Sequence, residues 1–304
     1  MSRTSPEKVI ETIHLRKRYG QLVAVDDLNL NVFRGDVFGF LGPNGAGKST
    51  TIRMLVHLIR PTTGEVRLFG LPLAKYRASV LGKVGALVEK PDFYGFLTAR
   101  DNLRQIARML PQAADADIDE VLDTVGLQNR ADEKVKTYSH GMRQRLGIAQ
   151  ALLGHPELII LDEPTIGLDP QGMREVRLLI RRLAERGMTV FLSSHLLHEV
   201  EQVCTRMAII RQGKLVVEGD VAELLRSRPT RLLLELEAEP SVLNRIRELP
   251  FVLRVERENR TWKIDVPYAQ IPELNRLLVE WGGRVYRLEP KTSLEDYYLS
   301  LVNQ

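Results

Sequence analysis

The most restrictive feature of this sequence is a glycine-rich octapeptide between an apolar stretch and a helical pattern. It is followed by Thr50, fits the spacing G-x-x-x-x-G-K-[ST], and reads Gly42-Pro43-Asn44-Gly45-Ala46-Gly47-Lys48-Ser49. Val37 to Leu41 have the composition of a strand, and Thr51 to Ile59 carry apolar residues at helical spacing before Pro61. Glycines let backbone N–H groups converge on a phosphate, and a helix start adds its positive end. The octapeptide therefore predicts a phosphate-binding turn between a strand and a helix.

Lys48 and two carboxylates are the candidates for chemistry. We expect Lys48 to reach the β- and γ-phosphates of a nucleotide, and the Ser49 hydroxyl to hold Mg²⁺. Asp162 and Glu163 follow the apolar run Leu158 to Leu161, which is typical of a buried strand whose carboxyl end meets a ligand. Asp162 would then face Mg²⁺, and Glu163 would orient the attacking water. Taken alone, an acidic pair at the end of a strand is more often a solvated turn, and it is the phosphate-binding turn that favours catalysis.

Alternation of strands and helices predicts an α/β domain with a largely parallel sheet. The expected segments are strands near Ile13 to Leu15, Leu28 to Val32, Leu158 to Leu161, Thr189 to Ser193 and Ala208 to Ile210, and a mainly helical middle from Thr98 to Leu153. We assign this domain to residues 1–228, with a helical subdomain at about 90–155.

The pattern changes after residue 228. The order becomes β-α-β-β-α-β, which predicts a small α+β domain of ferredoxin-like type over residues 229–304. Its expected segments are Arg231 to Glu237, Pro240 to Leu249, Phe251 to Arg257, Thr261 to Val266, a helix carrying Ile271 and Leu278 that ends at Gly282-Gly283, and a strand near Val285. A terminal helix is expected behind the capping box Thr292 to Glu295.

Composition excludes several classes of protein. An apolar content of 44% and a charged content of 27% are ordinary for globular domains. The single Cys204 excludes an internal disulfide and is expected to be buried. No apolar run approaches the roughly 18 residues of a membrane-spanning helix, and Met1 to Ile10 lacks the apolar core of a signal peptide. With a net charge of +4 and one run of three basic residues, Arg16 to Arg18, we expect no nucleic-acid partner.

Taken together, the motifs resemble those of the ATP-binding subunits of ABC transporters, in the family's order from Tyr19 to His195. The phosphate-binding turn is followed by a segment similar to the family's signature, Ser139-His140-Gly141-Met142, by Leu161 to Pro170 (LDEPTIGLDP), and by Ser193-Ser194-His195. The resemblance implies the P-loop NTPase fold of an ABC cassette, that is, a mixed, mostly parallel sheet with a helical subdomain. It implies ATP and Mg²⁺ as cofactors.

The resemblance also assigns roles. Tyr19 would stack on adenine, Glu163 and His195 would be catalytic, and Glu89 would join Ser49 and Asp162 near Mg²⁺. The signature of one subunit would cap the ATP of a second subunit, with Asp169 bridging the two. Because the chain has one phosphate-binding turn, we expect a dimer, most simply a homodimer. From the residues alone, Tyr19 is better explained as an ordinary half-buried tyrosine. Ser139 is a good helix N-cap, and a Ser-Gly helix start is also an anion site.

Two departures from the family pattern point to a subgroup. Glu89 stands where most members carry glutamine, which adds negative charge beside the phosphates and predicts slower turnover. His140 replaces the first glycine of the signature. Glu89 with Pro91 and Phe93, the signature, and Ser293 to Tyr297 resemble export-type subunits associated with peptide-antibiotic and drug resistance.

The resemblance implies an integral-membrane permease as partner, and hence a cytoplasmic protein peripheral to the inner face of the cell membrane. Its ATPase would power export of a drug, peptide antibiotic, lipid or similar substrate. We expect Lys90 to Arg104, with Phe93, Tyr94, Phe96 and the helix cap Thr98, to form the groove that binds this permease. The same aromatic residues fit the core of the helical subdomain equally well, so both interpretations stay open.

Two other functions fit parts of the pattern. A non-transport ATPase of the same superfamily, acting in DNA repair or translation, would show tandem cassettes, zinc-ligand cysteines or a long coiled coil, and the sequence shows none of these. A catalytically weak nucleotide sensor is suggested only by Glu89 and His140. His195 and His198 have the spacing of a metal pair, but no third ligand is near them in sequence, so we expect no metal there.

Overall fold

The computed structural model describes residues 7–110, 113–226, 229–238, 240–258 and 261–291, together with residues 294 and 298. It consists of two compact units, Met1–Glu218 and Gly219–Gln304. The division therefore falls earlier than the boundary placed after residue 228 from the sequence. The capping box formed by Thr292 and Glu295 lies outside the described residues.

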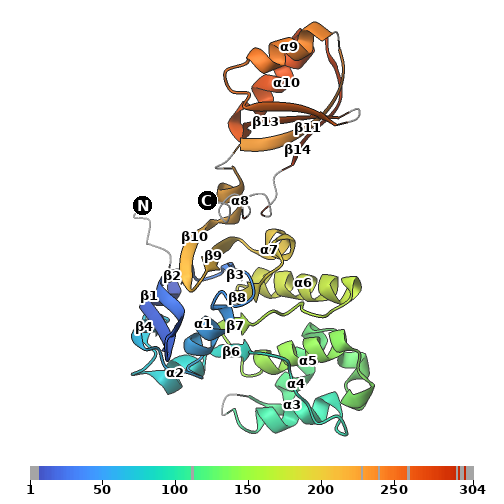
Figure 1. The fold of residues 1–304 in the computed structure, drawn as a ribbon. Coiled ribbons are helices and arrows are strands. Elements are labelled where there is room, and N and C mark those ends of the chain that lie inside the picture. The colour runs from blue at the N-terminus through green and yellow to red at the C-terminus, as the bar shows by residue number, and fades with distance from the viewer. Residues whose placement is uncertain are drawn as a thin grey trace, which may run out of the picture. The chain divides into compact units, whose positions relative to one another are not determined.

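A six-stranded sheet with the order β10-β9-β3-β8-β7-β6 forms the centre of the first unit (Figure 1). Its strands are β3 (Val37–Leu41), β6 (Val84–Leu87), β7 (Leu158–Leu161), β8 (Thr189–Ser194), β9 (Arg206–Arg211) and β10 (Lys214–Asp220). β9, β3, β8, β7 and β6 pair in parallel. All residues of β3, β7 and β8 are buried, as expected for strands covered on both faces. The predicted parallel sheet is confirmed.

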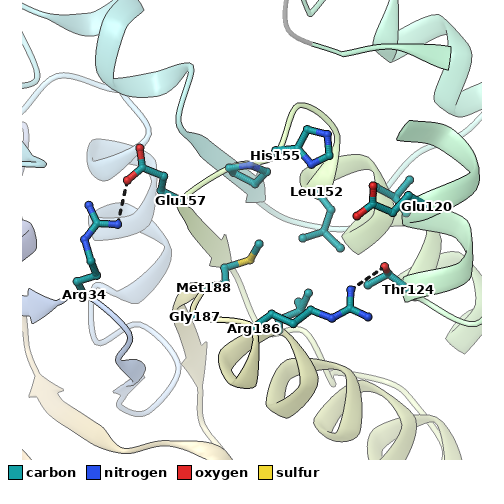
Figure 2. A pocket seen from close by; sticks show the side chains of 12 residues that line it. Arg34, Glu120, Thr124, Leu152, His155, Glu157, Arg186, Gly187 and Met188 are labelled. Atoms are coloured by element: carbon teal, nitrogen blue, oxygen red, sulfur yellow. Dashed lines mark hydrogen bonds and ion pairs between the residues drawn. The ribbon is translucent and has the colours of Figure 1, made fainter. Parts of the chain in front are cut away.

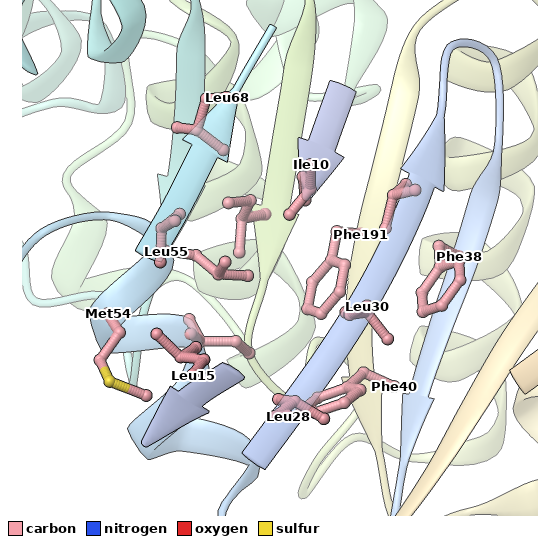
Figure 3. Close-up of a cluster of buried hydrophobic side chains, with 14 of the residues drawn as sticks. Ile10, Leu15, Leu28, Leu30, Phe38, Phe40, Met54, Leu55, Leu68 and Phe191 are labelled. Carbon is pink, nitrogen blue, oxygen red and sulfur yellow. The ribbon is translucent and has the colours of Figure 1, made fainter. Parts of the chain in front are cut away.

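An antiparallel sheet of order β2-β1-β4-β5 packs against this centre. It contains β1 (Lys8–Tyr19), β2 (Leu22–Phe33), β4 (Thr63–Leu68) and β5 (Leu71–Pro72). Figure 3 shows the resulting core, in which Ile10 and Leu30 of this sheet meet Phe38 and Phe191 of the parallel sheet. The rings of Phe38 and Phe191 stack with their centroids 5.7 Å apart. This core holds the phosphate-binding turn and the helix that follows it in place.

The helices of the first unit are α1 (Lys48–Leu55), α2 (Arg77–Leu81), α3 (Ala99–Ala107), α4 (Asp115–Thr124), α5 (His140–Leu152), α6 (Pro170–Glu185) and α7 (Leu197–Val203). α1 begins earlier and ends earlier than the predicted Thr51 to Ile59. It stops because His57 adopts a left-handed backbone, with φ of 58°. The predicted helical middle is confirmed as α3, α4 and α5, which pack on one another. Thr98 caps α3 by accepting a hydrogen bond from the Asp101 amide.

The second unit has the predicted β-α-β-β-α-β order after a short helix, α8 (Val221–Arg226). Its elements are β11 (Pro229–Glu237), α9 (Pro240–Glu248), β12 (Arg254–Glu258), β13 (Thr261–Pro267), α10 (Ile271–Glu280) and β14 (Arg284–Lys291). The sheet is antiparallel with the order β12-β13-β11-β14. Leu232, Ile264 and Leu278 are completely buried in its own core.

Arg206, at the start of β9, ties several elements of the first unit together. Its guanidinium lies 4.6 Å from the centroid of the Phe33 ring, and it donates to Asp36 at 3.2 Å and to Glu218 at 3.1 Å. It also donates to the Asn31 carbonyl at 3.0 Å. Burial raises the pKa of Glu218, and the neighbouring Arg206 acts in the opposite direction. Arg206 therefore compensates two largely buried carboxylates.

We expect Arg206→Gln to lower the free energy of unfolding of this unit by about 2 kcal/mol at neutral pH, because charged hydrogen bonds are lost. Glu218 has a higher pKa in the folded state than in the unfolded state. Such a carboxyl contributes its full stability at a pH below its unfolded-state pKa, and this contribution is lost as the pH rises through its folded-state pKa. Removal of Arg206 should raise the pKa of Glu218 further, so the deficit should be larger at pH 8 than at pH 5. Urea unfolding at both pH values measures this.

Arg67→Gln, which removes an exposed pair with Glu65, is the matched control and should change stability little. Equal losses for the two variants would contradict the role given to Arg206.

Candidate functional site

The phosphate-binding turn has the predicted position between β3 and α1. Gly47 has φ of 107°, and a Cβ atom there would lie 2.4 Å from the Ala24 carbonyl oxygen. A Cβ atom at Gly42 would lie 2.4 Å from the Ile210 carbonyl oxygen. Both positions accept only glycine, because any side chain would collide with backbone that cannot move away.

A cavity of about 550 Å³ opens over this turn, which is within the usual size range of small-molecule sites. The residues that line it are Tyr19, Leu22, Val23, Ala24, Pro43, Asn44, Gly45, Gly47, Lys48, Ser49, Thr50, Glu163, Ile166, Gln212 and Gly213. Tyr19 is 46% exposed, and the Lys17 ammonium lies 5.1 Å from the centroid of its ring. An aromatic ring in this position can stack on a planar ligand.

Sequence reasoning missed the walls of the cavity. Leu22, Val23 and Ala24 come from β2, and Gln212 and Gly213 form the turn between β9 and β10. The Gly213 amide donates to the Ala46 carbonyl at 2.9 Å, which fixes the turn against the phosphate loop. None of these residues has a motif of its own, since only the folded chain brings the segments together.

Lys48 is the buried cation of the site, with 6% of its surface exposed. Its ammonium donates to the carbonyl oxygens of Gly42 at 2.7 Å and Pro43 at 3.3 Å. It also lies 3.2 Å from Glu163 Oε1. A buried ammonium requires such compensation, and the same group can bind the oxygens of an incoming phosphate.

Ser193 organises the acidic pair at the end of β7. Its hydroxyl donates to Asp162 Oδ1 at 2.6 Å and accepts the Glu163 backbone N–H at 2.9 Å. The Ser193 side chain is completely buried, and Glu163 has a left-handed backbone with φ of 48°. For a residue other than glycine such a backbone is uncommon and must be held by its surroundings. Ser193 therefore holds both carboxylates in place, a role that the sequence alone did not suggest.

His195 completes the chain of contacts. Its Nδ1 lies 2.8 Å from Glu163 Oε2. Because an ionised carboxylate can only accept, Nδ1 carries the proton of this hydrogen bond. The side chains of Lys48, Glu163 and His195 are thus connected in one line along the carboxyl edge of the parallel sheet, where β3, β7 and β8 end. The structure brings together the residues for which we predicted phosphate binding and catalysis.

The oxygen donors near the turn fit Mg²⁺. Ser49 lines the cavity, and Asp162 stands at the end of β7 with 7% of its surface exposed. No group of three His, Cys, Asp or Glu residues that could hold a metal unaided occurs among the described residues.

Glu89, which we also expected near Mg²⁺, has a different partner. It follows β6 with a left-handed backbone, φ of 67°, and forms an ion pair with Arg53 of α1. Its side chain is 63% exposed, and it is not among the residues that line the cavity. The extra negative charge expected beside the phosphates is thus compensated by Arg53.

The signature residues lie at the start of α5 and do not line the cavity. Ser139 caps this helix by accepting from the Met142 amide at 3.2 Å, and His140 Nε2 lies 3.4 Å from the Ile166 carbonyl. Asp169 caps α6 by accepting from the Gly172 amide at 2.9 Å. The contact with Ile166, which does line the cavity, places His140 beside its rim, but no signature residue lines the cavity itself.

A second cavity, of about 250 Å³, lies at the opposite edge of the sheet (Figure 2). Arg34, Glu157 and Met188 line it: Glu157 and Met188 directly precede β7 and β8, and Arg34 lies in the turn before β3. Arg34 pairs with Glu157 at 2.9 Å, and Arg186 donates to Thr124 at 3.3 Å. Ligands of α/β sheets bind beyond the carboxyl ends of the strands, so the cavity at the phosphate-binding turn is the candidate site.

This fold and this site define an ATPase of the P-loop class. The chain belongs to the ABC transporter family, whose model matches residues 25–166, and it is an ATP-binding subunit of that family. It is 44% identical to the bacitracin transport ATP-binding protein BcrA of Bacillus licheniformis, over 97% of both chains. It is 35% identical to the linearmycin resistance ATP-binding protein LnrL of Bacillus subtilis, over 86% of both chains.

Solved structures agree with this assignment. An ATP-binding cassette in a dimeric post-hydrolysis state, bound to ADP and Pi, superimposes with a TM-score of 0.63 and 25% identity. The match covers 70% of this chain and 98% of that cassette. In the described part of the chain, no helix is both long enough and apolar enough to span a membrane.

We expect Ser193→Ala to lower kcat for ATP hydrolysis by about 10- to 100-fold, because small misplacements of catalytic groups are costly. Affinity for nucleotide should change little, since Lys48 and the glycine turn are untouched. Steady-state ATPase rates and fluorescent-nucleotide titrations measure the two effects.

Thr189→Ala is the matched control, because it removes a completely buried hydroxyl at the other end of β8. It should lower stability without a comparable loss of kcat. A Ser193→Ala protein with the parent's kcat would show that Glu163 does not need this hydroxyl.

Proposed function

We propose that this protein is the ATP-hydrolysing subunit of an ABC exporter and powers a separate membrane permease. The observation that carries the proposal is the line of contacts from Lys48 through Glu163 to His195 at the edge of the nucleotide cavity. The similarity to bacitracin transport and linearmycin resistance proteins supports export of an antibiotic-like compound. The permease would determine which compound is transported.

In the proposed reaction, Glu163 orients and polarises a water molecule for in-line attack on the γ-phosphate. His195 fixes the Glu163 carboxylate through Nδ1. The opposite side of the His195 imidazole ring faces the phosphate. Lys48 binds phosphate oxygens, and Tyr19 stacks on the adenine. Bound Mg²⁺, held by Ser49 and Asp162, would neutralise charge on the β- and γ-phosphates. The ion pair between Glu89 and Arg53 supports normal turnover and weakens the alternative of a nucleotide sensor.

We further propose that the working form is a dimer, most simply of two copies of this chain. Ser139, His140, Gly141 and Met142 do not line their own cavity and would cap the nucleotide of the second copy. Asp169 would lie between the two copies. The dimeric state of the related cassette described above supports this arrangement. Two bound ATP molecules would close the dimer, and hydrolysis would release it.

The permease would bind at the aromatic segment that precedes α3. Tyr94 is 61% exposed, Phe96 is 69% exposed, and their ring centroids lie 5.8 Å apart. Asn102, which is buried, accepts from the Tyr94 amide at 2.9 Å and so holds this segment rigidly. Exposure of both rings favours a docking surface over the core interpretation, while Phe93 is half-buried. Binding there would place the protein at the cytoplasmic face of the membrane.

We expect Glu163→Gln to lower ATP turnover by about 10²- to 10⁴-fold while Mg·ATP binding persists, as for loss of a general base. Lys48→Ala should instead lose nucleotide binding, because the buried cation is gone. Isothermal calorimetry with Mg·ATP and a phosphate-release assay on purified protein separate the two effects. The proposed function fails if the parent protein takes up no Mg·ATP, or if Glu163→Gln turns over at the parent's rate.

We expect the pair of substitutions Tyr94→Ala and Phe96→Ala to remove at least about 90% of the permease recovered with this protein from detergent-solubilised membranes, since exposed aromatic anchors dominate interface energies. The ATPase rate of the isolated protein should be unchanged. Leu58→Ala, at another exposed apolar position, is the control. Full recovery of the permease with the double variant would place the docking surface elsewhere.

A further inference from the structure

The segment that carries His195 is short and needs support from elsewhere. His195 lies between the end of β8 at Ser194 and the start of α7 at Leu197. α7 has no side-chain N-cap, and a helix of this length is not stable by itself. The position of His195 must therefore depend on contacts that α7 makes with other elements.

α6 supplies these contacts. Arg177 forms an ion pair with Glu199 of α7, and Arg181 donates to the backbone carbonyl of Gln202. Arg177 and Arg181 are four residues apart, so they lie on the same face of α6. The next residue of α7, Val200, is completely buried against Gly39 of β3, where an added Cβ would lie 2.6 Å from Val200 Cγ1. α7 is thus held by contacts with both α6 and β3.

Glu199 is unusual because it is a buried carboxylate. It is 5% exposed, and Arg177 binds only its Oε1. Within the described residues, its buried Oε2 has no hydrogen-bond partner. Burying a carboxylate costs free energy unless its charge is paired. The ion pair with Arg177 therefore fixes the position of Glu199 and, through it, of α7.

Glu199 also lies next to the segments that position the catalytic carboxylate. A small cavity of about 10 Å³ is lined by Glu199 and Arg177 together with Pro164, Thr165 and Ser193. Pro164 and Thr165 directly follow Glu163, and Ser193 holds the Glu163 amide. A cavity of this size is about that of one water molecule, so the groups around it are closely packed.

From these contacts we infer that Glu199, held by Arg177, is a positioning residue for ATP hydrolysis. It fixes the start of α7 so that His195 Nδ1 meets Glu163 Oε2. The inference rests on the hydrolytic roles proposed for Glu163 and His195. Glu199 does not line the nucleotide cavity, and we assign its effect on hydrolysis to the placement of His195.

The test compares the effect of Glu199→Gln in the parent protein with its effect in a His195→Ala background. Glu199→Gln keeps the shape of the side chain but removes its charge, and it should lower kcat by about 10-fold or more, as expected when a catalytic group is misplaced. The Kd for Mg·ATP should stay close to the parent's value. In a His195→Ala background, Glu199→Gln should lower single-turnover hydrolysis no further, because the group that it positions is already absent.

Arg177→Gln should reproduce the effect of Glu199→Gln, and the two together should lose no more activity than either alone. It also serves as the second variant if Glu199→Gln does not fold, as judged by Tm. Arg182→Gln, at an exposed position of α6, is the matched control and should hydrolyse ATP at the parent's rate.

Two results would overturn the inference: an unchanged kcat in Glu199→Gln, or the same fold-loss in the parent and His195→Ala backgrounds. Either result leaves the proposed function intact if the parent hydrolyses ATP and Glu163→Gln does not. A parent without ATPase activity, or a His195→Ala protein at the parent's rate, would instead overturn the roles on which the inference rests.

Discussion

Compensation of the buried Lys48 ammonium is the interaction on which the site depends. The ammonium sits below the glycine turn with two backbone carbonyls and the Glu163 carboxylate as its partners. This is possible because β3, β8 and β7 are neighbours in a parallel sheet, so that their carboxyl ends meet at one edge. The turn after β3, the acidic pair after β7 and His195 after β8 therefore converge without a long loop. An antiparallel arrangement would send one of these groups to the opposite edge.

Buried hydrogen bonds and ion pairs refine this convergence. Ser193 joins the two carboxylates at the end of β7, and the left-handed backbone of Glu163 persists because its amide is held. Further from the site, the same principle recurs at Arg206, which compensates Asp36 and Glu218, and at Arg177, which compensates Glu199. In each case a cation on one element fixes a carboxylate on another, so that charge pairing and not apolar packing alone determines how the elements meet.

The two units of the chain differ in how they relate to this chemistry. The first unit contains the nucleotide cavity, the signature and the aromatic segment around Tyr94. The second unit has its own apolar core around Leu232, Ile264 and Leu278, and in its sheet the part-buried pair Arg231 and Asp265 joins β11 to β13. Its β-α-β-β-α-β order was predicted from alternation and turn residues, although β12 begins at Arg254 and not at Phe251. In the sequence, Phe251 continues the apolar alternation, but the strand pairing with β13 begins only at Arg254.

The sequence by itself determined the groups whose role depends only on their own short segment of chain. Gly42, Gly47, Lys48 and the Asp162-Glu163 pair were recognisable because backbone conformation, helix start and strand end are properties of short segments. Only the tertiary structure decided which groups meet. It placed Ser193 between the acidic residues, turned Glu89 toward Arg53, brought the β2 residues and the Gln212-Gly213 turn over the phosphate loop, and exposed Tyr94 and Phe96. These contacts join residues tens to hundreds of positions apart, and no short segment contains the information about its distant neighbours.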